Sequence, residues 1–126
     1  MQQILLIGLG GALGSMSRYG ISIGSRQIAP ASIPIGTFSA NMLGCFLIGL
    51  LATLFLSGDL IPKEWQLPIS VGFLGGLTTF SSFSLETIRL LDTNDWKYAV
   101  GNILANVVCG TALTVLGMML GRKWVG

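Results

Sequence analysis

Ten residues in the middle of the chain, GGLTTFSSFS from Gly75 to Ser84, combine two glycines, five hydroxyl side chains and two phenylalanines. Hydroxyl groups donate hydrogen bonds without a fixed charge, and the edge of an aromatic ring is electrostatically positive. Phe80 and Phe83 are three residues apart, so their rings would share one face of a helix. Hydroxyls lie on either side of them, at Thr79, Ser81, Ser82 and Ser84. The pattern suits the binding of a small anion, although the spacing alone equally fits two core phenylalanines.

The same stretch is expected to interrupt a helix. Gly75 and Gly76 each lose about 1 kcal/mol of helix propensity relative to alanine. Thr78 and Thr79 are stiff at χ1 because their side chains branch at the β carbon. Inside a membrane, the backbone groups freed by such a break are tolerated only against protein, water or a bound ion. We therefore expect a candidate ion site at the break.

Polar side chains spaced four residues apart form two further stripes. The first contains Thr37 and Asn41, and the second contains Asn102, Asn106, Gly110 and Thr114. Amides and hydroxyls in a membrane span cost free energy unless they face protein or a water-filled path. Single asparagines often join helices, but two stripes together favour a polar path that includes Asn41, Asn106 and Thr114. Gly110 supplies no side-chain donor to that path.

The composition indicates a membrane protein. Of the 126 residues, 52% are hydrophobic and only 10% are charged, far from the profile of a soluble domain. The chain has no histidine, and it contains no pairing of nucleophile and base, no metal-ligand cluster and no phosphate loop, so we expect no enzyme. Cys45 and Cys109 stand alone in apolar surroundings and are expected to be small buried residues rather than a disulfide.

Long uncharged stretches predict the membrane spans. They run over Met1–Ser17, Gln27–Gly58, Trp65–Leu85 and Tyr98–Gly121. About 20 helical residues cross a hydrocarbon core of about 30 Å, so each stretch can hold one span. Breaker residues separate them at 29–34, at 57–62 (which includes Asp59) and at 92–95. We expect an all-α membrane protein whose residues 1–126 form a single domain with four spans, the third of them broken.

The basic residues are almost equally divided between the two sides of the membrane, so they give little preference for one orientation of the chain. Lys63, Arg122 and Lys123 fall on one side of a four-span chain, and Arg26, Arg89 and Lys97 fall on the other. Because loops rich in Lys and Arg normally stay in the cytoplasm, this balance predicts insertion in both orientations and an antiparallel dimer. An insertion partner that sets one topology is the alternative. Small residues four apart favour close helix packing, as in Gly10-xxx-Gly14, Ala40-xxx-Gly44, Gly101-xxx-Ala105-xxx-Cys109 and Gly117-xxx-Gly121.

Three motifs resemble the Fluc (CrcB) fluoride channels of microbes. They are GGALGS at 10–15 with Arg18 and Tyr19, GTFSANMLGCFLIG at 36–49, and GFLGGLTTFSSFSLE at 72–86. The resemblance covers nearly the whole chain, and the third motif is highly specific. It implies an antiparallel, dual-topology homodimer in a cell inner (plasma) membrane. It also implies passive fluoride export through two pores, with a structural sodium ion on the two-fold axis.

The resemblance also suggests roles for single residues. Phe80 and Phe83 are similar to the pore aromatics, and Asn41 is similar to the pore amide of the second span. The backbone carbonyls of Gly75 and Thr78 match the sodium ligands. Arg18 and Glu86 match positions that we expect near the vestibules.

The residues by themselves leave the ion open, because a path of uncharged donors does not exclude chloride. Two other classes of protein are alternatives. A small multidrug-type exporter needs an acidic residue in the first span, and Met1–Ser25 has none; Glu86 is the only carboxylate bordering a span core. A structural or assembly subunit would tolerate replacement of Phe80 and Asn41 by residues of similar size with no change in ion flux.

Overall fold

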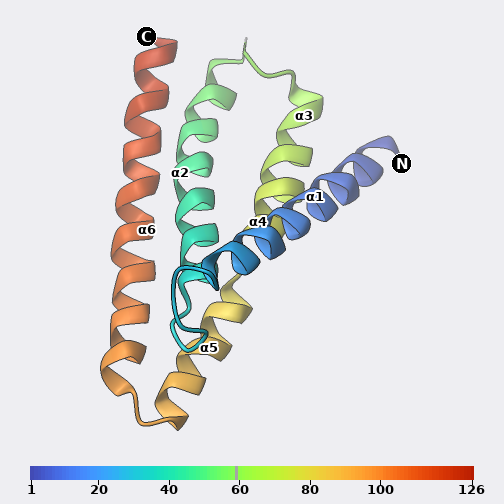
Figure 1. Ribbon diagram of the computed structural model, residues 1–126. Helices are drawn as coiled ribbons and strands as arrows, with labels where there is room; N and C mark the ends of the chain where they lie inside the picture. The colour runs from blue at the N-terminus through green and yellow to red at the C-terminus, as the bar shows by residue number, and fades with distance from the viewer. Residues whose placement is uncertain (59) are drawn as a thin grey trace.

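The structure is a computed structural model that describes residues 1–58 and 60–126; Asp59, in the second predicted joint, lies outside them. All the elements of the described residues are helices (Figure 1). They are α1 (Gln2–Ser25), α2 (Ile35–Ser57), α3 (Lys63–Leu67), the π-helix η1 (Pro68–Leu74), α4 (Gly75–Leu77), α5 (Phe80–Asp92) and α6 (Trp96–Val125). The all-α prediction is confirmed.

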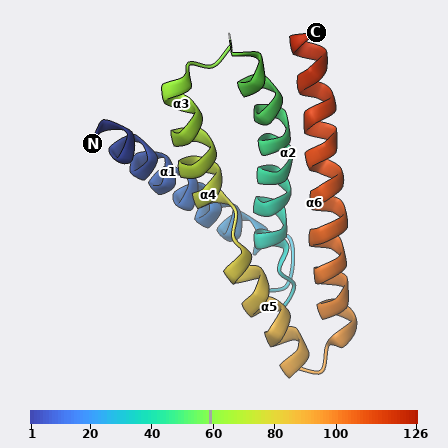
Figure 2. The ribbon, with the colours of Figure 1, turned by 180° about the vertical axis from the view of Figure 1, so that it is seen from behind.

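Three helices of the described residues, α1, α2 and α6, are long and apolar enough to cross a membrane. The predicted third span corresponds to four shorter pieces, α3, η1, α4 and α5, which follow one another from one end of the molecule to the other (Figures 1 and 2). The third span is therefore interrupted, as expected. That this broken stretch also crosses the membrane stays a prediction.

Helices α2 and α6 form a pair that lies side by side and runs in the same direction (Figures 1 and 2). Glycines let the two backbones touch. A β carbon on Gly49 would collide with the backbone of Thr114, and one on Gly117 would collide with the carbonyl of Phe46. The small-residue spacing predicted for the end of the last span, Gly117-xxx-Gly121, thus packs against α2.

Helix α1 crosses η1 and α4 obliquely, whereas α5, at the end of the broken stretch, contacts α6 (Figures 1 and 2). The contact is again between backbones. A β carbon on Gly10 would meet the Pro68 carbonyl, one on Gly14 would meet the Phe73 carbonyl, and one on Gly76 would meet the Gly11 carbonyl. The spacing of Gly10 and Gly14 therefore packs helices together, as predicted.

The predicted packing stripe Gly101-xxx-Ala105-xxx-Cys109 packs poorly against the other described helices. Within residues 1–58 and 60–126, no atom outside the helix's own backbone lies within 4 Å of a β carbon placed on Gly101, and Cys109 is exposed. The expectation that both cysteines are buried is wrong for Cys109, while Cys45 is half-buried. Helix α6 buries one narrow face, and Cys109 lies outside it; the buried residues are Ala99, Asn102, Gly110, Gly117 and Gly121.

Candidate functional site

The break in the predicted third span lies at two threonines. Thr78 has φ −87° and ψ 155°, and Thr79 has φ −153° and ψ 122°, so both are extended between α4 and α5. Gly75 and Gly76, which the sequence suggested as breakers, are still helical. The two glycines also differ from each other. Gly76 lies against the backbone of α1, whereas the nearest atom to a β carbon on Gly75 would be the Ser70 carbonyl oxygen at 4.0 Å. The threonines alone carry the interruption.

Asn41 of α2 binds the extended segment through both backbone groups of Thr79. The Thr79 amide donates to Asn41 Oδ1 at 2.9 Å, and Asn41 Nδ2 donates to the Thr79 carbonyl at 3.2 Å. One carboxamide thus replaces the helical partners that the break removes. Thr79 also starts α5, because its hydroxyl accepts a hydrogen bond from the Ser82 amide at 3.2 Å.

The backbone carbonyls of Gly75 and Thr78 lose their usual donors at the break. In a continuous helix they would accept from the amides of Thr79 and Ser82. Those amides donate instead to Asn41 Oδ1 and to the Thr79 hydroxyl. Gly75 itself is exposed. Two carbonyl oxygens are therefore available beside the break, and oxygen is the ligand that hard cations prefer.

An open groove of about 430 Å³ lies along the break. Five of the predicted pore residues line it: Asn41, Thr79, Phe80, Phe83 and Asn106. The carbonyl-bearing Gly75 and Thr78 also line it. No lining residue of this groove carries a charged side chain. The groove is therefore lined by amide, hydroxyl and aromatic side chains together with aliphatic ones.

The two predicted pore aromatics lie together at the start of α5. The ring centroids of Phe80 and Phe83 are 5.5 Å apart, and the ring planes are tilted by 53°. Phe80 is 78% exposed, a high value for a large apolar side chain. Both rings line the groove, and the edge is the positive part of an aromatic ring.

Other predicted pore residues lie beside the groove rather than on its wall; in the described part of the chain these are Ser81, Ser82, Ser84 and Thr114. The Thr79 hydroxyl is 3.1 Å from the Ser81 hydroxyl and 3.2 Å from that of Ser82, so these three form one cluster. Ser84 is half-buried further along α5. The Thr114 hydroxyl donates to the carbonyls of Cys45, at 3.1 Å, and Gly110, at 3.0 Å, in the contact between α2 and α6.

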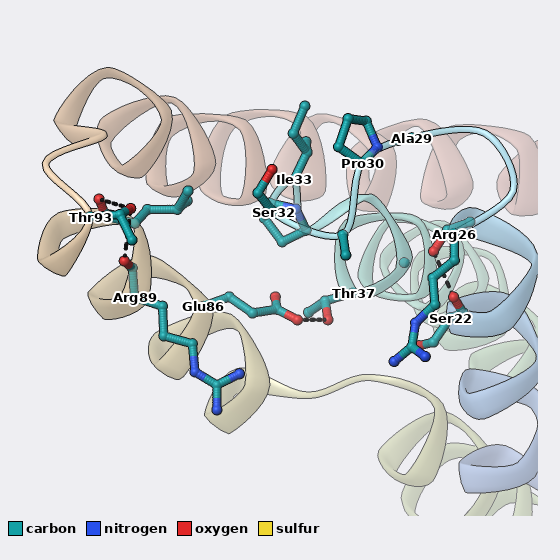
Figure 3. A pocket seen from close by; sticks show the side chains of 15 residues that line it. Ser22, Arg26, Ala29, Pro30, Ser32, Ile33, Thr37, Glu86, Arg89 and Thr93 are labelled. Carbon is teal, nitrogen blue, oxygen red and sulfur yellow. Dashed lines mark hydrogen bonds between the residues drawn. The ribbon is translucent and has the colours of Figure 1, made fainter.

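A second, polar cavity of about 310 Å³ lies where the segment after α1 meets α5. Glu86 lines it and accepts a hydrogen bond from the Thr37 hydroxyl at 2.7 Å. Arg26 and Arg89 flank this pair from opposite sides (Figure 3). Thr37 belongs to the polar stripe of the second span, but the sequence did not connect it to Glu86. This cavity suits a vestibule that holds both signs of charge.

Arg18, the other predicted vestibule residue, lies elsewhere. Its Nε donates to the Gly76 carbonyl at 3.1 Å, just before the break. A half-buried guanidinium therefore stands behind the broken segment, on the side of α1. The sequence predicts both residues near the vestibules; Arg18 contacts the carbonyl of Gly76 in α4, and Glu86 of α5 lines the polar cavity.

Sequence reasoning missed one residue of the site. Thr87 of α5 donates to the Phe83 carbonyl at 2.8 Å and accepts from Asn102 at 2.9 Å. A single threonine in a helix gives no sequence signal of its own. Its spacing of four residues from Phe83 was the available indication, because that spacing lets a hydroxyl reach a pore residue's carbonyl.

Comparison with known proteins adds to this geometry. Residues 5–118 match the family described as CrcB-like protein, Camphor Resistance (CrcB). A protein of Citrifermentans bemidjiense named fluoride-specific ion channel FluC is 43% identical over 122 residues, which is 97% of this chain and 98% of that protein. A protein of the same name from Chloroflexus aurantiacus is 41% identical over 100% of this chain and 99% of its own length. Another, from Sorangium cellulosum, is 38% identical over 99% of this chain and 98% of its own length.

Proposed function

The chain belongs to the CrcB family, and from this premise we propose that it is a passive, fluoride-selective ion channel that exports fluoride and so relieves its toxicity. The resemblance noted in the sequence is confirmed by the family match, and so is the expectation of a non-enzyme, because the curated relatives are ion channels. The observation that carries the proposal is the uncharged groove where Asn41, Phe80 and Phe83 meet the extended threonines.

The chemistry of the groove suits a small, strongly hydrated anion. Hydroxyl hydrogens and positive ring edges replace water around fluoride, while a fixed cation would hold the ion too tightly to release it. Arg26 and Arg89 at the polar cavity attract anions to the entrance, and Glu86 limits how long they stay. Thr79, Asn106 and the serines of α5 extend the path on either side of the aromatic pair.

The single chain leaves the groove open, with Phe80 on its rim. We propose that a second, antiparallel copy closes it, which gives two pores per homodimer. The balance of basic residues between the two sides supports dual topology. The balance is also consistent with a location in the inner (plasma) membrane, where both orientations would be inserted.

A structural sodium ion at the dimer centre fits the residues present. The carbonyls of Gly75 and Thr78 lack their helical donors, and the Gly75 side of α4 is open within this chain. Both copies would contribute these oxygens. Bound sodium would supply positive charge at the two-fold axis and join the two subunits there.

The test is fluoride efflux from liposomes that contain the purified chain, followed with a fluoride electrode, with chloride efflux as the comparison and no pH gradient. Rapid fluoride release without chloride release is the expected result. Absence of fluoride release would refute the proposal. A requirement for a pH gradient would replace passive flow with coupled transport and make Glu86 the first residue to replace.

A further inference from the structure

Three asparagines and a threonine link the break to the backbone of α5 in one hydrogen-bond chain. Asn41 Nδ2 donates to Asn106 Oδ1 at 3.2 Å, and Asn106 Nδ2 donates to Asn102 Oδ1 at 3.0 Å. Asn102 Nδ2 then donates to the Thr87 hydroxyl at 2.9 Å. Thr87 donates to the carbonyl of Phe83 at 2.8 Å. We call these four side chains, Asn41, Asn106, Asn102 and Thr87, the amide relay.

The direction of the amide relay is fixed by its last acceptor. The Phe83 carbonyl has no hydrogen to give, so the Thr87 hydroxyl must donate to it and can then only accept from Asn102. Asn102 must present Nδ2 to Thr87 and Oδ1 to Asn106. A flipped Asn102 amide would set its NH₂ against the NH₂ of Asn106. Asn106 Nδ2 also donates to the backbone carbonyl of Asn102 at 2.9 Å, which requires the same orientation of Asn106, and Asn106 Oδ1 then accepts from Asn41.

The orientation of Asn41 matters because its two ends serve different partners at the break. Its Oδ1 must accept from the Thr79 amide, and its Nδ2 must donate to the Thr79 carbonyl. Both hydrogens of Nδ2 are used, one at Thr79 and one at Asn106. The relay and the Thr79 backbone therefore require the same orientation of the Asn41 amide, and the relay adds a hydrogen bond that holds it.

The far end of the relay is more deeply buried than the near end. Asn102 is 9% exposed and Thr87 is 6% exposed, whereas Asn41 and Asn106 are half-buried on the groove wall. Neither Asn102 nor Thr87 lines the groove. Asn102 lines a separate pocket of about 230 Å³ whose other residues are mainly apolar, so an Asn102 amide that loses the Thr87 hydroxyl has few side-chain acceptors to replace it.

We propose that Asn102 and Thr87 are positioning residues of the pore, which set the carboxamide of Asn41, and through it the Thr79 break, without touching the ion. This inference rests on the proposed channel function. It extends the site from the groove into the contact between α5 and α6. It also gives a role to the Asn102 amide. The polar stripe by itself fits either a pore-lining residue or a residue that joins two helices.

The test compares Thr87→Val, which keeps the shape but removes the hydroxyl, with Thr87→Ser, which keeps the hydroxyl. Fluoride efflux per reconstituted protein should fall about tenfold in Thr87→Val, because a buried hydrogen-bond partner is lost. It should stay within about twofold of the wild type in Thr87→Ser. The matched control is Thr53→Val, since Thr53 is 7% exposed and donates to the Leu50 carbonyl, away from the relay. This control should conduct like the wild type.

A second comparison separates positioning from simple packing. In an Asn106→Ala background the relay is already cut between Thr87 and Asn41, so adding Thr87→Val should lower flux no further. A packing role predicts the same fold loss with or without Asn106→Ala. Near-additive losses would overturn the proposal, as would a Thr87→Val chain that conducts like Thr53→Val. Size-exclusion profiles of each variant check that the protein remains assembled.

The outcome for the wild type distinguishes the two proposals. A silent wild-type chain refutes the channel function, and the inference falls with it. A conducting wild type with an unaffected Thr87→Val variant refutes only the relay. If Thr87→Val does not assemble, Asn102→Leu takes its place, because it removes the same hydrogen bond from the α6 side. Unchanged flux in that variant would also overturn the proposal.

Discussion

Replacing Phe80 by isoleucine should abolish most of the fluoride flux while leaving the fold of the chain nearly intact. Complete removal of a phenylalanine side chain from water is worth about 3 kcal/mol. Phe80 is 78% exposed, so the part that the chain covers corresponds to about 0.7 kcal/mol by the same scale. Loss of the ring contact with Phe83 adds about 0.5–1.5 kcal/mol. The total is a small part of the 5–15 kcal/mol typical of a folded domain.

The effect on flux should be larger than the effect on stability. Isoleucine keeps apolar volume but has no positive edge, so an anion that leaves water finds one partner fewer beside Asn41. We expect fluoride efflux to fall about tenfold or more, the equivalent of about 1.4 kcal/mol in the barrier. Phe83→Ile should behave in the same way, because both rings line the groove.

The assay is fluoride efflux from liposomes at matched protein density, with the elution volume of each variant measured in detergent. Phe55→Ile is the control, since Phe55 is a half-buried phenylalanine of α2 that does not line the groove. This variant should conduct normally. Retained flux in both Phe80→Ile and Phe83→Ile would remove ring edges from the mechanism. Loss of assembly in either would show that the rings hold the subunits together.

Three further outcomes are expected. Gly76→Ala should lower the yield of assembled protein, because its methyl group meets the backbone of α1, whereas Gly75→Ala should leave the single chain folded. Size-exclusion chromatography compares the two yields, and equal yields would contradict the packing of Gly76 against α1. Thr37→Val should reduce fluoride efflux several-fold and Thr37→Ser should not, since Glu86 keeps a hydroxyl donor only in the second variant; similar rates in both would count against a role for the pair. Exchange of sodium for a large organic cation during purification should weaken the dimer if the carbonyls of Gly75 and Thr78 bind sodium, and a dimer that is equally stable in both salts would exclude that site.

Some of the fold could be read from local pattern. The uncharged stretches and their breakers gave helices close to the observed bounds of α1, α2 and α6, because hydropathy and charge act residue by residue. The paired threonines at 78 and 79 also indicated the break, since β-branching is a local property. The glycines beside them were misread as breakers. Whether a glycine frees the backbone or admits a neighbouring helix depends on what packs there, and Gly76 faces α1.

In the candidate site, too, features within one helix were predictable and contacts between helices were not. Asn41, Phe80 and Phe83 are brought together as expected, because each lies on a polar or aromatic pattern visible in one helix. The partner of Asn102 was not predictable, since it depends on how α5 and α6 are rotated toward each other. The exposure of Cys109 was missed for a related reason: in a membrane protein, apolar surroundings in sequence do not imply contact with the rest of the chain.

The fixed direction of the amide relay has a consequence for how this sequence can diverge. A change at one position must keep the donor or acceptor that its neighbours require, so acceptable changes at 41, 87, 102 and 106 are coupled to one another. Replacing Asn106 by serine, for example, keeps one oxygen but shortens the reach to Asn41, and a longer side chain elsewhere would have to restore the bond. Relatives should therefore inherit these four positions as matched sets, while the serines of α5 vary one at a time.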